Sequence, residues 1–352
     1  MAAADIAEQR TTRGTQRRTF GLAARAVGLI VGVFTVAVVA LLSLRIGSIA
    51  ITTRDAWNAL FDYFPQSYQQ TVVRSLRLPR TIIGIGVGGG LAVAGATMQA
   101  VTRNPLASPS ILGVSSGSAF AIVTAVYYGG ITSPLGYIWF AFAGGLAASA
   151  LVFLIGAAGR DGPSPVKLAL AGVVVSALLG AWTRALLLLD EQTLDSVRFW
   201  FAGSVAGRSL TTFWIVSPFL IGGALACIFM GHQLNVLSMG DAAARALGMR
   251  AGRIRLLCSV LVVLITGAAV SAAGPIAFVG LATPHIVRAI VGPDYRWVLP
   301  YSLLGGAIML TGADILGRVV ARPGEVQVGI VTALIGAPFL IYLARRRNVG
   351  TL

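Results

Sequence analysis

Long apolar segments separated by short polar ones dominate the chain. Ten such runs, bounded by charges or by proline and glycine clusters, fall at 27–49, 81–101, 111–129, 135–158, 166–189, 210–230, 254–274, 276–291, 298–320 and 326–343. Most have close to the ~20 residues that an α-helix needs to cross the hydrocarbon core of a bilayer. The pattern predicts an all-α polytopic membrane protein with about ten transmembrane helices. The run at 276–291 is short for a full crossing, and we expect it to be a helix buried among its neighbours.

The composition excludes an ordinary soluble domain. Hydrophobic residues make up 56% of the chain, charged residues 11%, and the mean hydropathy is +0.83. A soluble domain has about a quarter of its residues charged. Cys227 and Cys258 lie within or beside apolar runs, without the spacing of a disulfide framework or a metal site. We expect both thiols to be buried and inert.

The basic excess, a net charge of +15, is explained by membrane orientation. With the N-terminus in the cytoplasm, seventeen of the 27 lysines and arginines fall on the cytoplasmic side and ten on the other. Positive loops stay inside, so both termini are predicted to be cytoplasmic, and no nucleic acid is expected as partner. We expect a flexible basic cytoplasmic arm at 1–26, a single transmembrane domain at 27–346 and a C-terminal tail at 347–352. The transmembrane domain contains one long cytoplasmic loop, at 231–253.

A glycine motif raises the question of a cofactor. Gly84, Gly86 and Gly89 have the G-x-G-x-x-G spacing of a dinucleotide-binding loop, which also needs a preceding strand and an acid about 20 residues later. No Asp or Glu occurs between Asp62 and Asp161, and no strand-like run precedes the glycines. The motif therefore does not indicate a cofactor site.

In a helix, the same stretch places small residues at every fourth position. Gly84, Gly88, Ala92 and Ala96 fall on one face. Small residues at this spacing let two membrane helices approach closely, and they also leave room where a helix lines a path. Both interpretations remain open for this face.

The residues needed for catalysis or for binding ATP are missing. A Walker A loop requires a lysine directly after its last glycine, whereas Lys167, the only lysine, follows Val166. His232 and His285 are isolated from each other and from carboxylates, so no metal or acid–base site is expected. Asp314 is the best candidate for a membrane-buried acid, the feature that usually marks ion-coupled transport. The chain is not expected to be an enzyme or to bind a cofactor.

The loop at 231–253 carries a helix signal of its own. Asp241 is a good N-cap residue, Ala242–Ala246 favour helix, and Gly248 suits a C-terminal cap. The pattern predicts a short capped helix over Asp241–Leu247. It is either an incidental helical turn or a projection that a cytoplasmic partner grips, and composition alone does not decide between these.

Four segments resemble the FecCD family, the permeases of ABC importers for iron–siderophores, haem and cobalamin. They are "RLPRTIIGIGVGGGLAVAGATMQAVTRNPLASPSILGVSSGS" (77–118), "MGDAAARALGM" (239–249), "AGPIAFVGLATPHIVRAIVGPDYRWVLP" (273–300) and "PGEVQVGIVTALIGAPFLIYLARR" (323–346). The resemblance covers nearly the whole chain beyond residue 26. It implies ten helices per subunit, a second identical or paralogous permease subunit, two cytoplasmic ATPase subunits that use ATP and Mg, and an extracytoplasmic binding protein. Gln327 departs from the family pattern, which has proline there.

The resemblance also implies roles for particular residues. Coupling to the ATPase would fall to Leu234, Gly240, Asp241, Ala244, Arg245, Leu247 and Gly248. Arg77, Arg80 and Arg318 would face outward and pair with acids of the binding protein. The translocation path would be lined by Gly84, Gly88, Ala92 and Met98, with Asn104 and Pro105 of the "NPLA" turn at its inner mouth.

The function implied is inward transport of a ferric siderophore by alternating access, without chemistry on the substrate. The resemblance also implies that the chain lies in the cytoplasmic (inner) membrane of a bacterium. Cobalamin or haem is the alternative cargo. Two other classes remain: an ion-coupled secondary transporter, in which Asp314 would matter, and a structural membrane protein without a pathway.

Overall fold

The computed structural model describes residues 21–158 and 165–345, and all regular elements in these ranges are helices. They are α2 (Leu22–Arg45), α3 (Thr53–Phe61), α4 (Tyr68–Val72), the π-helical η1 (Val73–Arg77), α5 (Leu78–Thr102), the 3-10 turn η2 (Pro109–Leu112), α6 (Val114–Gly129), α7 (Pro134–Ala157), α8 (Pro165–Leu189), α9 (Glu191–Phe201), α10 (Leu210–Phe229), α11 (Gly231–Ser238), α12 (Asp241–Ala246), α13 (Ala251–Ala273), α14 (Val279–Val291), α15 (Tyr295–Val320) and α16 (Val328–Arg345). The all-α prediction is confirmed. Helix α2 begins inside the predicted arm, while residues 1–20 of that arm and the tail 347–352 lie outside the described residues.

Each of the ten apolar runs coincides with one helix: α2, α5, α6, α7, α8, α10, α13, α14, α15 and α16. Within the described ranges, seven segments are long and apolar enough to cross a membrane. They are α2, the segment Tyr68–Thr102, which consists of α4, η1 and α5, and all or most of α7, α8, α10, α13 and α15. Helix α14 and residues Val328–Tyr342 of α16 are apolar but shorter. The chain is therefore an integral membrane protein.

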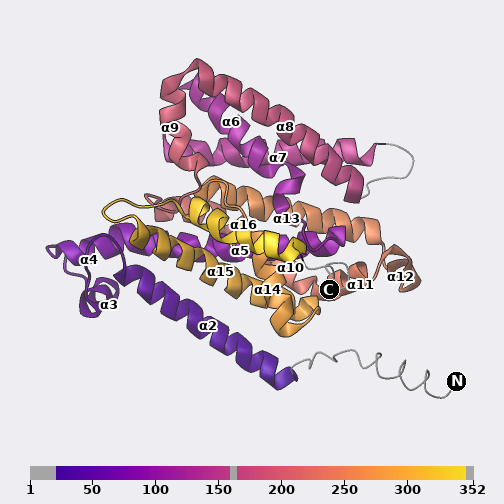
Figure 1. Cartoon of the computed structure of the whole chain (residues 1–352), viewed down its shortest axis with the longest axis horizontal. Coiled ribbons are helices and arrows are strands. Elements are labelled where there is room, and N and C mark those ends of the chain that lie inside the picture. Colours follow the sequence, from indigo (N-terminus) through magenta and orange to yellow (C-terminus); the bar gives the residue numbers. More distant parts are fainter. Residues whose placement is uncertain (1–20, 159–164, 346–352) are drawn as a thin grey trace.

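Helix α5 is the centre of the subunit. In its most apolar window 83% of residues are buried within the protein, against 11% for α2, which lies on the outside (Figure 1). Its main neighbours are α15, α13, α14 and α10. Protein rather than lipid therefore surrounds most of α5.

Glycines let α5 approach its neighbours at backbone distance. A Cβ placed on Gly88 would lie 2.3 Å from the carbonyl oxygen of Gly306 in α15, and one on Gly95 would lie 1.8 Å from that of Gly280 in α14. On the same face, a Cβ on Gly84 would meet Thr311 of α15 at 3.3 Å. The glycine-rich stretch is thus a helix-packing surface.

Helices α6 to α9 form a group at one side of the subunit (Figure 1). Their own close contact is at Gly117, whose added Cβ would lie 2.3 Å from the Gly144 carbonyl oxygen in α7. Helix α13 joins this group to α5 and α10. The rings of Phe142 and Phe219, with centroids 4.8 Å apart, add a link between α7 and α10.

Short helices occupy the two ends of the bundle (Figure 1): α3, α4 and α9 lie at one end, and α11 and α12 at the other. Side-chain caps set several starts, since these oxygens satisfy backbone N–H groups that lack an intrahelical partner. Thr52 accepts from the Asp55 N–H at 3.1 Å to begin α3, and Asp190 accepts from the Thr193 N–H at 2.9 Å to begin α9. Helix α14 begins later than its apolar run because Phe278 has a φ of 67°.

Candidate functional site

The α11–α12 segment projects at one end of the bundle. A short helix is present over Asp241–Ala246, with Leu247 as its C-cap. The prediction that Asp241 is the N-cap is wrong, because Gly240, with a φ of 108°, takes that position. Gly248 follows the helix with a φ of 74°, a conformation that glycine adopts without strain, as its predicted cap role requires.

The predicted coupling residues divide into an anchored set and a projecting set. Leu234 and Ala244 are fully buried and hold the segment against the core. Arg245 and Gly248 are exposed, and Leu247 and Met239 are exposed to 66% and 70%. Two large apolar side chains are thus presented at the tip beside a cation, a composition that suits a protein partner more than water.

Polar contacts tie this projection to the long helices. Asp241 accepts from the Arg255 guanidinium of α13 at 2.8 Å and lies 3.9 Å from that of Arg103, directly after α5. Asn235 of α11 donates to Asp294 at 2.7 Å and accepts from the Tyr295 N–H at the start of α15. Displacement of the projection would therefore reach α5, α13 and α15.

Asp294 is the N-cap of α15, and its surroundings favour the charged form of its carboxyl group. Hydrogen bonding from Arg296, together with the Asn235 amide, lowers the pKa of its carboxyl to about 2. The carboxylate is therefore ionised at any physiological pH, which keeps the α11–α15 contact in place.

The predicted inner-mouth turn lies beside the same projection. Residues 104–107 follow Arg103, and the Asn104 side chain accepts from the Leu106 N–H at 2.9 Å. Arg103 itself has a φ of 52°, which turns the chain sharply at the end of α5. Asn104 is exposed and Pro105 is half-buried.

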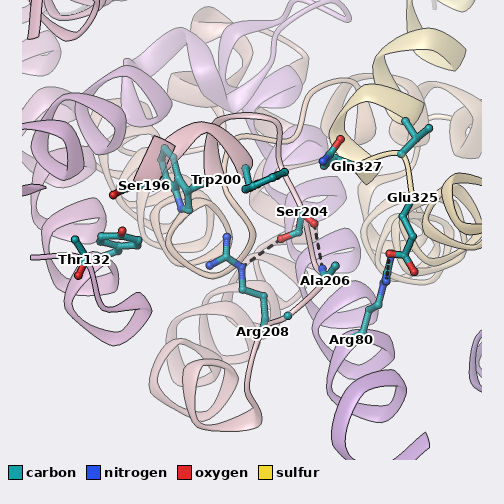
Figure 2. Close-up of a pocket in the computed structure, with 13 residues that line it drawn as sticks. Arg80, Thr132, Ser196, Trp200, Ser204, Ala206, Arg208, Glu325 and Gln327 are labelled. Carbon is teal, nitrogen blue, oxygen red and sulfur yellow. Dashed lines mark hydrogen bonds and ion pairs between the residues drawn. The ribbon is translucent and has the colours of Figure 1, made fainter. Parts of the chain in front are cut away.

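A pocket of about 440 Å³ lies at the opposite end of the bundle. Its walls come from the start of α7, from α9, and from the segments 204–208 and 325–327 (Figure 2). They include two arginines and one acid, Arg80, Arg208 and Glu325, together with Tyr137 and Trp200. The sequence pattern did not reveal this pocket; its only signal was an excess of arginine on the predicted outer side, Arg208 among them.

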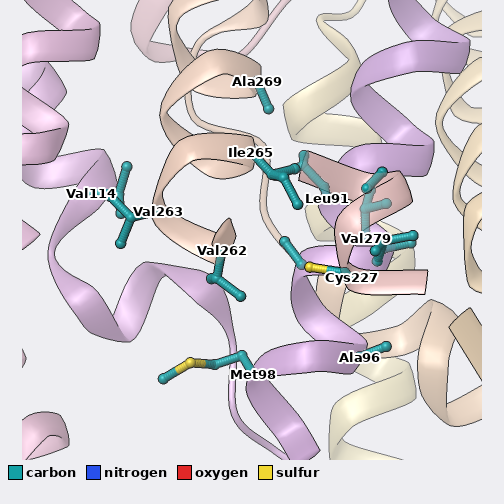
Figure 3. Packing of buried hydrophobic residues seen from close by; sticks show 14 of the residues in the cluster. Leu91, Ala96, Met98, Val114, Cys227, Val262, Val263, Ile265, Ala269 and Val279 are labelled. Atoms are coloured by element: carbon teal, nitrogen blue, oxygen red, sulfur yellow. The ribbon is translucent and has the colours of Figure 1, made fainter. Parts of the chain in front are cut away.

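The predicted path residues lie inside the subunit. Ala92 is fully buried and Met98 is 1% exposed, in the apolar core that α5 shares with α10, α13 and α14 (Figure 3). Gly84 and Gly88 face α15 at close range. These positions serve helix packing in one subunit, so a path-lining role stays a prediction that these contacts do not support.

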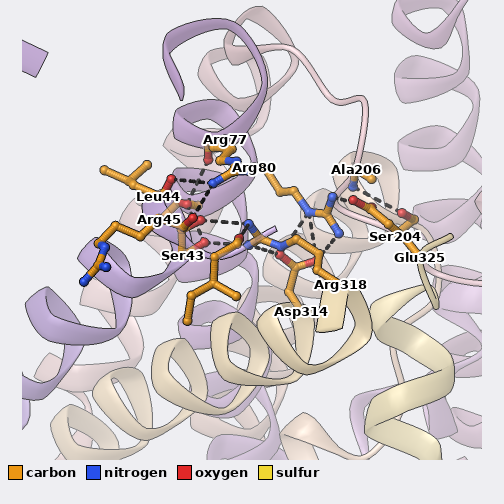
Figure 4. Close-up of polar contacts among 12 residues, drawn as sticks. Ser43, Leu44, Arg45, Arg77, Arg80, Ser204, Ala206, Asp314, Arg318 and Glu325 are labelled. Carbon is orange, nitrogen blue, oxygen red and sulfur yellow. Dashed lines mark hydrogen bonds and ion pairs between the residues drawn. The ribbon is translucent and has the colours of Figure 1, made fainter. Parts of the chain in front are cut away.

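The three arginines expected to face outward are buried, with exposed fractions of 6% for Arg77, 9% for Arg80 and 2% for Arg318. Their expected exposure is therefore wrong. Arg77 and Arg318 donate to backbone carbonyls at the end of α2, including Leu44 at 2.9 Å and Ser43 at 2.8 Å (Figure 4). These bonds satisfy carbonyls that a helix end leaves without partners.

Asp314 is the acid at the centre of this arginine cluster. It accepts from Nη2 of Arg80 at 2.8 Å and also from Arg318, while Arg80 reaches Glu325 at 2.6 Å (Figure 4). Both carboxylate oxygens of Asp314 are thus engaged by guanidinium groups of the same subunit. Asp314 does not resemble the free membrane acid that a proton-coupled carrier requires.

Among the described residues, no group of three or more His, Cys, Asp or Glu side chains could hold a metal ion. His232 is exposed, and the His285 ring packs edge-on against Phe339 with centroids 5.9 Å apart. Cys227 and Cys258 are buried free thiols, as expected.

Comparison with known proteins agrees with this architecture. The sequence profile of the FecCD transport family matches residues 35–346. The Fe(3+)-citrate import system permease protein YfmD of Bacillus subtilis is 46% identical over 88% of this chain and 91% of its own length. The cobalamin import system permease protein BtuC of Halobacterium salinarum is 40% identical over 80% of this chain and 76% of its own.

A solved structure has the same fold. It is described as an inward-facing conformation of a metal-chelate type ABC transporter, and it is 30% identical with a TM-score of 0.79, covering 90% of this chain and 98% of that one. The profile match over most of the chain and the identity to whole-length relatives agree with each other. The chain therefore belongs to the FecCD transport family.

Proposed function

We propose that this chain is the membrane-spanning subunit of an ABC importer that moves a ferric siderophore inward, driven by separate ATPase subunits. The observation that carries the proposal is the α11–α12 projection of a FecCD-family chain, with its exposed apolar tip and its Asp241 contacts to α5 and α13. An exposed apolar tip of this kind favours contact with a protein partner.

The mechanism is alternating access without chemistry on the substrate. The ATPase grips the tip formed by Met239, Arg245 and Leu247, and its closure displaces α12. The contacts of Asp241 and Asn235 pass this movement to α5, α13 and α15. Because α5 and α15 touch through their backbones, they move as one body. ATP and Mg are used by the partner, and this chain holds no cofactor.

The binding protein docks at the end that carries α3, α4 and α9. Arg45, Arg54 and Arg74 are exposed there. Arg77 and Arg318, by contrast, donate hydrogen bonds to backbone carbonyls within the subunit. The exposed arginines are therefore better placed to pair with acids of a partner. Such rim charges mainly set orientation and association rate.

A second permease subunit completes the path. Helix α8 exposes a row of large apolar side chains, among them Leu170, Val174 and Leu178, and α16 exposes Leu334 and Ile341. Lipid or a second subunit, identical or paralogous, covers these faces. A path between subunits also agrees with the burial of the predicted path residues inside one subunit.

The cargo is a metal chelate. Ferric siderophore is the first choice because YfmD, the relative at 46% identity, is named for Fe(3+)-citrate. Cobalamin stays an alternative because one relative is named for it, and haem stays one because another relative, at 34% identity, is named for hemin. An ion-coupled carrier is disfavoured by the pairing of Asp314 with two arginines.

The deciding experiment is uptake of a radiolabelled ferric chelate into cells that depend on this chain, with Gly248→Asp as the test variant. Gly130→Asp is the matched control, because both glycines have positive φ and open space around the Cβ position, but Gly130 ends α6, away from the projection. Loss of uptake in the first variant only, with both proteins present in the membrane, supports coupling through α12. Unchanged uptake that collapses with an uncoupler instead of vanadate would establish the ion-driven carrier.

A further inference from the structure

The pocket beside α9 has a positive charge that its own walls do not neutralise. Arg80 is paired with Asp314 and Glu325. Arg208, on the opposite wall, has no acid within ion-pair distance among the described residues, and its one recorded hydrogen bond runs from Nε to the Ser204 carbonyl at 3.4 Å. Its terminal nitrogens therefore remain available to an acceptor.

The segment that carries Arg208 is held in shape before any ligand arrives. The Ser204 N–H donates to the Ala273 carbonyl at the end of α13 at 2.8 Å, and the Ala206 N–H donates to the Ser204 hydroxyl at 3.2 Å. Gly207 makes the turn with a φ of 66°. A fixed backbone places the guanidinium on the pocket wall at low entropic cost.

Aromatic rings form the rest of the wall near this guanidinium. Tyr137 and Trp200 are buried, and Phe199 is exposed to 57%. The indole nitrogen of Trp200 is buried without an acceptor among the described residues, and Figure 2 shows it on the Arg208 side of the pocket. A buried donor without a partner is uncommon in a folded protein. Here it belongs to a residue that lines the same pocket as the unpaired cation.

Burial also acts on Arg208 itself. Desolvation lowers the pKa of its guanidinium from the ordinary value, with the neighbouring Tyr137 acting in the opposite sense. Arginine remains protonated under all physiological conditions, so the lowering marks an incompletely compensated cation. An anion in the pocket would relieve this cost.

We propose that this pocket receives one anionic arm of the metal chelate, a carboxylate or catecholate group, with Arg208 as its charge partner and Tyr137 and Trp200 as its walls. The volume of about 440 Å³ lies in the lower part of the range of small-molecule sites and suits one arm better than a whole chelate. The pocket would select for charge as the substrate leaves the binding protein. This inference rests on the proposed function and names the part of the chelate that the chain recognises.

The test is equilibrium binding of ⁵⁵Fe-citrate, an anionic chelate, to the assembled transporter in nanodiscs without its binding protein. Arg208→Gln should weaken binding by about tenfold, the size expected for one charge-assisted contact. Arg208→Lys should restore part of it. Arg345→Gln changes an exposed arginine at the end of α16, outside the pocket, and is the matched control that should leave binding unchanged. An uncharged ferric trihydroxamate should bind equally to all four proteins.

Two results would overturn the proposal. Equal losses for the charged and uncharged chelates would assign Arg208 a structural role. Unchanged chelate binding with weaker capture of the binding protein by Arg208→Gln would make Arg208 a docking residue for an acid of that partner. The proposed function has its own readout, ATP-driven uptake by the unmodified chain. If that uptake is absent the function fails, whereas if it is present and Arg208→Gln binds normally only the pocket inference fails.

Discussion

The guanidinium of Arg80 in α5 and the carboxylate of Asp314 in α15 meet at 2.8 to 2.9 Å, although 234 residues separate them in the chain. Arg318 also pairs with Asp314, so these three buried side chains form one ion-pair cluster. Glu325, which is exposed, contacts the Arg80 member of this cluster. A buried ion-pair cluster adds little net stability, but removing one member leaves an uncompensated charge. The cluster therefore fixes the axial position of α5 relative to α15.

Removing the central acid should damage the fold rather than the energy coupling. Asp314→Asn leaves two buried guanidinium groups around an uncharged amide, and breaking a buried pair in this way costs about 3–5 kcal/mol. We expect low yield and a strongly lowered melting temperature in detergent. Asp62→Asn, the same change at an exposed acid, should have no effect. A stable Asp314→Asn protein that no longer transports would instead support ion coupling.

The backbone contact between α5 and α15 gives a second prediction. Gly88→Ala would place a methyl group 2.3 Å from the Gly306 carbonyl oxygen, so the helices must separate. Overpacking of this kind costs about 1–3 kcal/mol and should lower the melting temperature by several degrees. Gly312→Ala in α15 meets nothing within 4 Å and should be neutral or slightly stabilising. Equal melting temperatures for both variants would show that the contact tolerates a methyl group.

The tie between α12 and α13 should matter for coupling more than for stability. Asp241→Asn removes the charge that faces Arg255 and Arg103 while keeping the side-chain shape. We expect ATP-driven uptake to fall several-fold at nearly unchanged melting temperature. The control is Asp195→Asn, whose pair with Arg198 is exposed and makes little contribution to stability. The informative readout is the ATPase rate per transported chelate, because a merely looser complex would lower both together.

Acid should loosen the α11–α15 contact through Asp294. The pKa of this carboxyl is depressed to about 2 in the folded chain, against 3.8 ordinarily. The stabilisation is therefore complete above about pH 4 and is lost as the pH falls toward 2. Melting temperatures between pH 6 and 2 should fall more steeply for the unmodified chain than for Asp294→Asn. Parallel curves would assign the acid sensitivity to other groups.

The sequence pattern predicts the long helices well and their partners poorly. All ten apolar runs are helices, because the requirement for an apolar surface acts locally along each segment. The short helix after Gly240 was predicted for the same local reason, although the glycine, not Asp241, occupies the cap position. Gly240 can hold a φ of 108° that other residues avoid.

Burial of the arginines could not be predicted from spacing. Arg318 donates to the Ser43 carbonyl, 275 residues away, and Arg80 meets Asp314 across a similar gap. The pocket around Arg208 likewise joins segments from five parts of the chain. Contacts of this range depend on how helices are packed, which the order of apolar and polar residues does not specify.

The position of α5 has a consequence for how such chains vary. A helix whose surroundings are protein is released from the demand that lipid places on an outer helix, so it can carry Arg80, Gln99 and a series of glycines and still be stable. Its most apolar window has a mean hydropathy of 1.6, against 2.7 for the outer helix α2. Substitutions should therefore be limited by volume in α5 and by polarity in α2. The helix that hydropathy ranks as one of the weaker membrane segments is the one whose shape the rest of the subunit depends on.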